Sequence, residues 1–142
     1  MKNAECRIGM KLAAYLIACL LLNGCAGAGD WSAPLVGDYA LWRLSGHQIC
    51  LVQERGAGGA DIIVDALIYR VTWNEEFICV QQTTPPETGK GLPIVPEVDY
   101  YILRVEDGAV FGPFSAEDYK KQLRELGIGT LPDWVDAQEL RP

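Results

Sequence analysis

Residues 38–53 read DYALWRLSGHQICLVQ, and this stretch decides the fold class of the chain. Two short runs rich in aromatic and aliphatic residues flank Ser45-Gly46, a pair that is typical of a turn. In the first run Tyr39 and Leu41 occupy alternate positions, so a strand would place both on one face. The stretch therefore predicts a β-hairpin, and its two apolar arms indicate that a sheet forms the core.

Two further stretches repeat this pattern of apolar run, turn and apolar run. Residues 67–82 do so around a turn at 74–76, and residues 98–111 do so around a turn at 106–108. Between them, residues 83–97 are rich in proline and glycine. Because proline has no backbone N–H to donate to a sheet, this segment is predicted to be a long loop.

One amphipathic helix is predicted near the C-terminus. Ser115 suits its N-cap, and Gly127 suits the position just after its end. Tyr119, Leu123 and Leu126 recur at helical spacing and form a single apolar stripe. That stripe must be buried, and one face of an antiparallel sheet is the available partner.

Together these elements predict an α+β fold. We expect an antiparallel sheet of about five to six strands with one principal C-terminal helix packed on one face. A single globular domain over residues 37–142 is expected, because a chain of this length buries about two-thirds of its unfolded surface.

The N-terminal residues have the pattern of an export signal. Lys2, Arg7 and Lys11 precede an uninterrupted apolar run over residues 12–22. As a helix this run would span about 16 Å, well short of the roughly 30 Å of bilayer hydrocarbon. The segment is therefore interpreted as a secretory signal and not as a permanent transmembrane helix.

Leu22-Asn23-Gly24-Cys25 follows the apolar run and resembles the lipobox of bacterial lipoproteins, with a departure at Asn23. The resemblance implies that residues 1–24 are removed as a signal peptide, that Cys25 carries the lipid, and that residues 25–36 tether the domain. It also implies a location on the cell membrane or outer membrane, facing the periplasm or the exterior. The alternative is ordinary signal-peptidase cleavage after residues 26–28, which read AGA.

The chain is acidic, with 19 Asp and Glu against 12 Lys and Arg and a net charge of −7. Residues 1–24 hold three basic residues and one acidic residue, so their removal would change the net charge to −9. A nucleic-acid partner is excluded, because such binders use clustered Lys and Arg to displace counterions. Besides the membrane, the expected partner is a cationic envelope protein or peptide.

Cys50 and Cys79 are the cysteines that would remain unmodified in the exported domain. Two alternatives stay open: a Cys50–Cys79 disulfide, which export permits, or two separate buried thiols. His47 is the single histidine, which leaves too few ligands for a zinc site. We expect no catalytic residue, no metal and no cofactor.

Carboxylates near the loop at residues 83–97 are the basis of an alternative function, an envelope hydrolase. Asp65 and Asp99 are among the acids that could line such a site. Glu75 and Glu76 cannot form its catalytic pair, because adjacent strand residues point to opposite faces.

Aromatic residues on the strands are the basis of another candidate binding surface. Tyr100 and Tyr101 are expected on opposite faces of one strand, so at least one can lie away from the helix. Trp31, near the end of the tether, is expected either at the membrane interface or docked on the domain.

Several of these segments together resemble a family of small uncharacterised lipoproteins common in bacteria. The resemblance covers residues 30–128 and rests on YALWR at 39–43, WNEEFI at 73–78, YYIL at 100–103, VFGPFS at 110–115 and ELGI at 125–128. It implies a lipid-anchored envelope protein without an assigned activity, and no catalytic residues. A non-enzymatic binding or structural role is therefore the first expectation.

Overall fold

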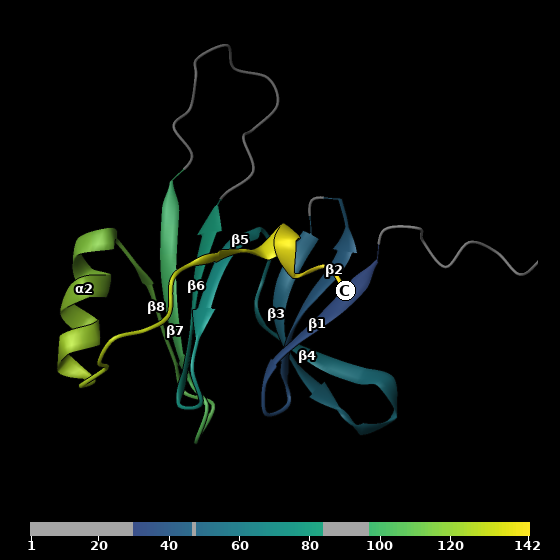
Figure 1. The fold of residues 1–142 in the computed structure, drawn as a ribbon, viewed down its shortest axis with the longest axis horizontal. Coiled ribbons are helices and arrows are strands. Elements are labelled where there is room, and N and C mark those ends of the chain that lie inside the picture. The colour runs from purple at the N-terminus through teal and green to yellow at the C-terminus, as the bar shows by residue number, and fades with distance from the viewer. Residues whose placement is uncertain (1–29, 47, 84–96) are drawn as a thin grey trace, which may run out of the picture.

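The computed structural model describes residues 30–46, 48–83 and 97–142, and these form two packed antiparallel sheets (Figure 1). The first sheet has the strand order β1-β2-β3-β4, and the second has the order β8-β7-β6-β5-β9. The first sheet consists of β1 (Trp31–Val36), β2 (Tyr39–Ser45), β3 (Gln48–Arg55) and β4 (Gly59–Val64), with the 3-10 turn η1 (Gly56–Gly58) between the last two. The second consists of β5 (Ile68–Trp73), β6 (Phe77–Thr83), β7 (Val98–Arg104), β8 (Val110–Phe114) and β9 (Val135–Asp136).

The predicted α+β class with one sheet and one principal C-terminal helix is wrong. The nine strands of the described residues divide into sheets of four and five, and α2 (Ala116–Glu125) is a helix of ten residues. After β9 the chain ends in a 3-10 turn, η2 (Ala137–Leu140). The error has a physical cause: alternation along a strand shows that one face is buried, but it does not show whether a helix or a second sheet covers that face.

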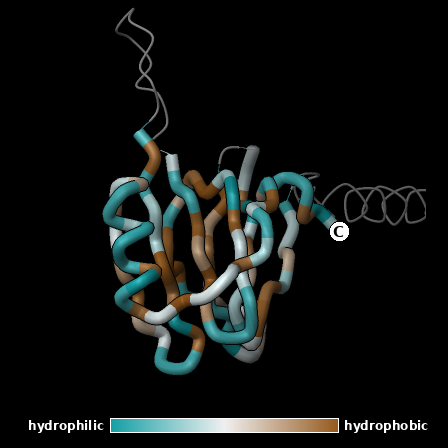
Figure 2. Tube along the Cα trace, turned by 60° about the vertical axis from the view of Figure 1, so that its left-hand side comes forward, coloured by the Kyte–Doolittle hydropathy of each residue, from teal (hydrophilic) through white to brown (hydrophobic). Residues whose placement is uncertain are grey.

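The main core lies between the two sheets. Leu41, Ile49 and Leu51 of the first sheet meet Val71 and Val80 of the second, and all five are at most 1% exposed. The apolar residues follow the strands, whereas polar residues line the turns and the outer side of α2 (Figure 2). Burial of apolar side chains between the sheets is therefore the main source of stability.

A second apolar cluster lies on the other face of the second sheet. Phe77, Cys79 and Ile102 point to this face and surround Tyr119 of α2. On β6, Ile78 alternates with these residues and points into the main core. The second sheet is thus buried on both faces, which accounts for the nearly continuous apolar sequence of β6.

The three predicted hairpins are confirmed. Leu41 pairs with Leu51 in β2–β3, Trp73 pairs with Ile78 in β5–β6, and Ile102 pairs with Phe111 in β7–β8. Local patterning was sufficient here because each hairpin joins strands that are adjacent in sequence.

The predicted caps of the helix are also present. The Ser115 hydroxyl accepts a hydrogen bond from the Asp118 backbone N–H at 3.1 Å, and Gly127 adopts a positive φ of 66°. Both features match the local conformations that these residue types favour at helix ends.

Residues 31–36 were expected in the tether, but they form β1 and pair with β2. Pro34 lies within β1, where it is tolerated because β1 is an edge strand. The folded domain therefore includes Trp31, which lies partly buried against the main core.

Three turns gather at one end of the domain. The Val105 N–H donates to the Glu76 carbonyl at 2.8 Å, which joins the β5–β6 and β7–β8 turns. A Cβ added at Gly108 would lie 3.2 Å from the Tyr39 hydroxyl, so the β1–β2 turn is at the same end. We call this the turn end, and the opposite end of the β1–β2 ladder is where Trp31 pairs with Arg43.

Candidate functional site

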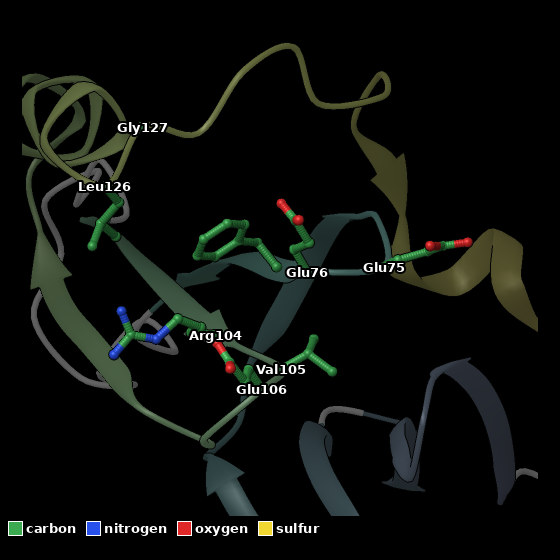
Figure 3. A pocket seen from close by; sticks show the side chains of 8 residues that line it. Glu75, Glu76, Arg104, Val105, Glu106, Leu126 and Gly127 are labelled. Atoms are coloured by element: carbon green, nitrogen blue, oxygen red, sulfur yellow. The ribbon is translucent and has the colours of Figure 1, made fainter.

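A depression of about 620 Å³ lies at the turn end (Figure 3). It combines acidic side chains with apolar ones, drawn from two turns and the C-terminal end of α2. We call it the turn-end depression, and it is lined by Glu75, Glu76, Phe77, Arg104, Val105, Glu106, Leu126 and Gly127.

The β5–β6 turn is held by Asn74. Its side-chain oxygen accepts hydrogen bonds from the backbone N–H groups of Glu76 at 2.9 Å and Phe77 at 2.8 Å. The Asn74 N–H donates in turn to the Phe77 carbonyl at 3.0 Å. Asn74 thus closes the turn through its own side chain. The turn therefore does not depend on the exposed carboxylates of Glu75 and Glu76.

Arg104 is the cationic residue that lines the depression, and its charge is already paired. Its Nε and one terminal nitrogen donate to the two Asp107 carboxylate oxygens at 3.0 and 2.7 Å. The guanidinium also lies 5.6 Å from the ring centre of Phe111. The three glutamates that line the depression therefore dominate its charge.

The Arg104 guanidinium and the Ala109 N–H lower the pKa of Asp107 to about 2. At the same end, burial and the nearby carboxylates of Asp38 and Asp107 raise the pKa of the Tyr39 hydroxyl. The two shifts have different causes: donated hydrogen bonds favour the charged form of Asp107, whereas burial and the acidic neighbours disfavour a negative charge on Tyr39.

The C-terminal end of α2 adds to the negative character of the depression. Leu126 and Gly127 line it, and they follow the last turn of the helix. The aligned peptide dipoles of a helix place a partial negative charge at its C-terminus. A cationic group is therefore favoured by the glutamates and by the helix end together.

The exposed glutamates make this depression suited to binding a cation. Glu75 and Glu76 lie in the β5–β6 turn, and their side chains point in different directions (Figure 3). Within residues 30–46, 48–83 and 97–142, no group of three or more His, Cys, Asp or Glu is arranged to hold a metal ion.

The structure does not bring Cys50 and Cys79 together. Both are free thiols, and they belong to different apolar clusters on different sheets. Cys50 lies on the outer face of the first sheet, where its Sγ is 3.8 Å from an Asp65 carboxylate oxygen. Cys79 lies beneath Tyr119 and is 0% exposed, and this burial raises its pKa to about 11.

Several residues considered in the sequence analysis lie outside the described part of the chain. These are Cys25 with the signal peptide at residues 1–24, the histidine at position 47, and residues 84–96 of the loop on which the hydrolase alternative rests. Of the acids considered for that alternative, Asp65 accepts a hydrogen bond from the Ala66 N–H at 2.7 Å.

The two tyrosines of β7 face opposite ways, as predicted. Tyr101 packs against the main core, whereas Tyr100 stacks on Tyr119 with ring centres 4.8 Å apart. Trp134 approaches the Tyr100 ring edge-on at 6.3 Å. Tyr100 therefore belongs to the aromatic packing beneath α2.

Sequence reasoning identified Glu75, Glu76 and Glu106 as turn residues but did not place their turns together. A usable signal was present, since β6 and β7 are joined by one connection and pair antiparallel. The turns before β6 and after β7 must then lie at the same end of the sheet. The contribution of α2 required tertiary structure.

These features define a mainly β domain of two antiparallel sheets with an acidic depression at one end. The chain belongs to the family described as "Protein of unknown function (DUF3997)", whose model matches residues 36–133. Comparison with curated proteins and with solved structures found no match. In the part of the chain that the structure describes, no helix is long and apolar enough to span a bilayer.

Proposed function

We propose that this chain is a lipid-anchored protein of the bacterial cell envelope with a non-enzymatic binding role. Its turn-end depression would receive a cationic segment of another protein or a peptide. The observation that carries this proposal is the lining of the depression, which combines three glutamates with apolar side chains and an arginine already paired with Asp107.

The apolar part of the lining refines the class of ligand. Phe77, Val105 and Leu126 offer surface to the methylene stem of a lysine or arginine, while the glutamates meet its charged head. A net negative charge also raises the rate of encounter with a cationic partner. The preferred ligand is therefore a segment that alternates basic and apolar residues.

The lipid anchor rests on the lipobox resemblance at residues 22–25. Labelling of growing cells with a palmitate analogue tests it, with incorporation expected for the native chain and none for Cys25→Ala. Equal labelling of both proteins, or none in either, would contradict the anchor.

Binding is tested with the full-length protein in detergent and a fluorescent peptide of alternating lysine and leucine. The test variant replaces Glu75, Glu76 and Glu106 with glutamine. We expect about tenfold weaker binding, because three exposed charge contacts contribute roughly 0.5 kcal/mol each. Added salt should weaken binding to the native protein.

The matched control removes three other exposed carboxylates, through Glu97→Gln, Glu117→Gln and Asp133→Asn. It has the same net charge as the test variant but leaves the depression intact. Equal weakening in both variants would show that overall charge, and not this site, attracts the peptide, and the proposed site would be rejected.

A further inference from the structure

A second depression, of about 340 Å³, lies at the opposite end of the β1–β2 ladder from the turn end. It is lined by Asp30, Trp31, Ser32, Trp42, Arg43 and Leu44. We propose that this end of the domain rests against the membrane surface, with Trp31, Trp42 and Leu44 at the lipid interface. The inference rests on the lipid anchor of the proposed function.

The side chains at this end suit a lipid interface. Leu44 is 44% exposed, and both tryptophans are partly exposed. Tryptophan is enriched at the boundary between hydrocarbon and water, because its indole is large and mostly apolar. The Trp31 Nε1 is buried and the Trp42 Nε1 is bonded to Glu54, so each ring would meet lipid through its apolar part. The two rings and Leu44 therefore provide apolar surface that lipid can cover.

The Trp42 ring is fixed in place. Its Nε1 donates to a Glu54 carboxylate oxygen at 2.8 Å, and the Ser32 hydroxyl donates to the same oxygen at 3.1 Å. These bonds join β1, β2 and β3 across the outer face of the first sheet. A ring held in this way can meet a membrane with little further loss of side-chain freedom.

The length of the tether favours the membrane as the surface that covers the second depression. Five residues, 26–30, lie between the expected lipid-bearing Cys25 and Trp31. Fully extended, they reach about 20 Å. The second depression therefore lies within that distance of the lipid, whereas the turn end is a further strand length away, about 20 Å for six residues.

Charge supports the same orientation. Asp30 and Arg43 line the second depression, and the Glu54 carboxylate is bonded to two of its other lining residues. Three glutamates line the turn-end depression, where the arginine is already paired with Asp107. Anionic headgroups therefore repel the turn-end depression more strongly than they repel the second depression. The turn-end depression would then face away from the membrane.

The test uses the lipidated full-length protein in vesicles of phosphatidylethanolamine and phosphatidylglycerol, with a brominated phosphatidylcholine as quencher of tryptophan emission. One variant, Trp73→Phe with Trp134→Phe, keeps the two tryptophans at the proposed interface. The reciprocal variant, Trp31→Phe with Trp42→Phe, keeps the other two. We expect strong quenching in the first variant and weak quenching in the second.

A second comparison guards against variants that fold poorly. Leu44→Asp should reduce the quenching of the otherwise native protein, whereas Ile62→Asp should not. Ile62 is a fair control, because it is 54% exposed and lies on β4, away from the second depression.

Palmitate labelling of the same preparations separates the two proposals. Labelled protein with equal quenching of both tryptophan pairs, or with no effect of Leu44→Asp, would overturn the membrane contact and leave the anchor intact. Absence of label would overturn both. Labelled protein with quenching confined to Trp31 and Trp42 would support both.

Discussion

Arg104 donates two hydrogen bonds, of 3.0 and 2.7 Å, to the Asp107 carboxylate across the β7–β8 turn. Asp107 also accepts from the Ala109 N–H at 3.1 Å, so one carboxylate closes the turn and pairs with the arginine. The pair thereby holds the turn that carries Glu106 into the turn-end depression.

The first prediction concerns the acid titration of this pair. The pKa of Asp107 is lowered from 3.8 to about 2, chiefly by its hydrogen bonds with Arg104. A lowered folded-state pKa adds stability above the unfolded value, so this contribution is complete above pH 3.8 and is lost as the pH falls through about 2. Carbon-13 NMR of the carboxyl group should report this pKa.

Arg104→Gln should raise the pKa of Asp107 toward 3.8. The control is Arg55→Gln, which breaks the exposed Arg55–Asp61 pair at a different hairpin and should leave Asp107 unchanged. An Asp107 titration that is the same in all three proteins would refute the role given to Arg104.

The second prediction concerns Tyr119, which covers Cys79 and stacks on Tyr100. Tyr119→Ala should lower the free energy of unfolding by about 3–5 kcal/mol, as is usual when a buried aromatic ring is removed. Tyr119→Phe keeps the ring but loses the hydrogen bond to the Cys79 thiol, so a loss of about 1 kcal/mol is expected. Urea unfolding measures both values, and equal losses would contradict the packing role.

The third prediction concerns the two thiols, measured in a full-length protein in which Cys6, Cys19 and Cys25 are replaced by alanine. Cys50 and Cys79 are at most 2% exposed, and burial is the main reason that both pKa values are raised. At pH 8 a thiol with a pKa of about 11 is ionised to about one part in a thousand, so alkylation of Cys79 should be very slow in the native protein.

Both thiols should react rapidly in urea, since unfolding exposes them and restores their ordinary pKa values. Intact mass without reductant provides the check on pairing. A mass lower by two hydrogens, with no thiol titrated in urea, would establish the Cys50–Cys79 disulfide and contradict the free thiols of this structure.

The fourth prediction concerns Gly112 on the edge strand β8. Its φ is 130°, and an added Cβ would lie 2.7 Å from the Tyr100 carbonyl oxygen. Gly112→Ala should therefore destabilise the domain by about 1–3 kcal/mol or more. Gly59→Ala is the control, because no atom lies within 4 Å of its added Cβ, and a change within about 0.5 kcal/mol is expected. Similar thermal midpoints for both variants would contradict the close approach at Gly112.

The helix caps and hairpins illustrate what local patterning can predict. Ser115 caps the helix through its own hydroxyl, and Leu41 and Leu51 meet across a hairpin whose strands are adjacent in sequence. The partition of the strands into two sheets could not be predicted from local patterns. Sheet membership depends on which strands pair after the chain crosses from Val64 to Ile68, and no local pattern records that crossing.

The candidate sites divide in the same way. The sequence by itself determined the acidic charge, the apolar strands, the turns that carry Glu76 and Glu106, and the lipobox resemblance at Cys25. Tertiary structure alone decided that two turns and the end of α2 surround one depression, and that Trp31 and Trp42 border another. The physical reason is that charge and periodicity are properties of neighbouring residues, whereas a binding surface arises where segments distant in sequence pack together.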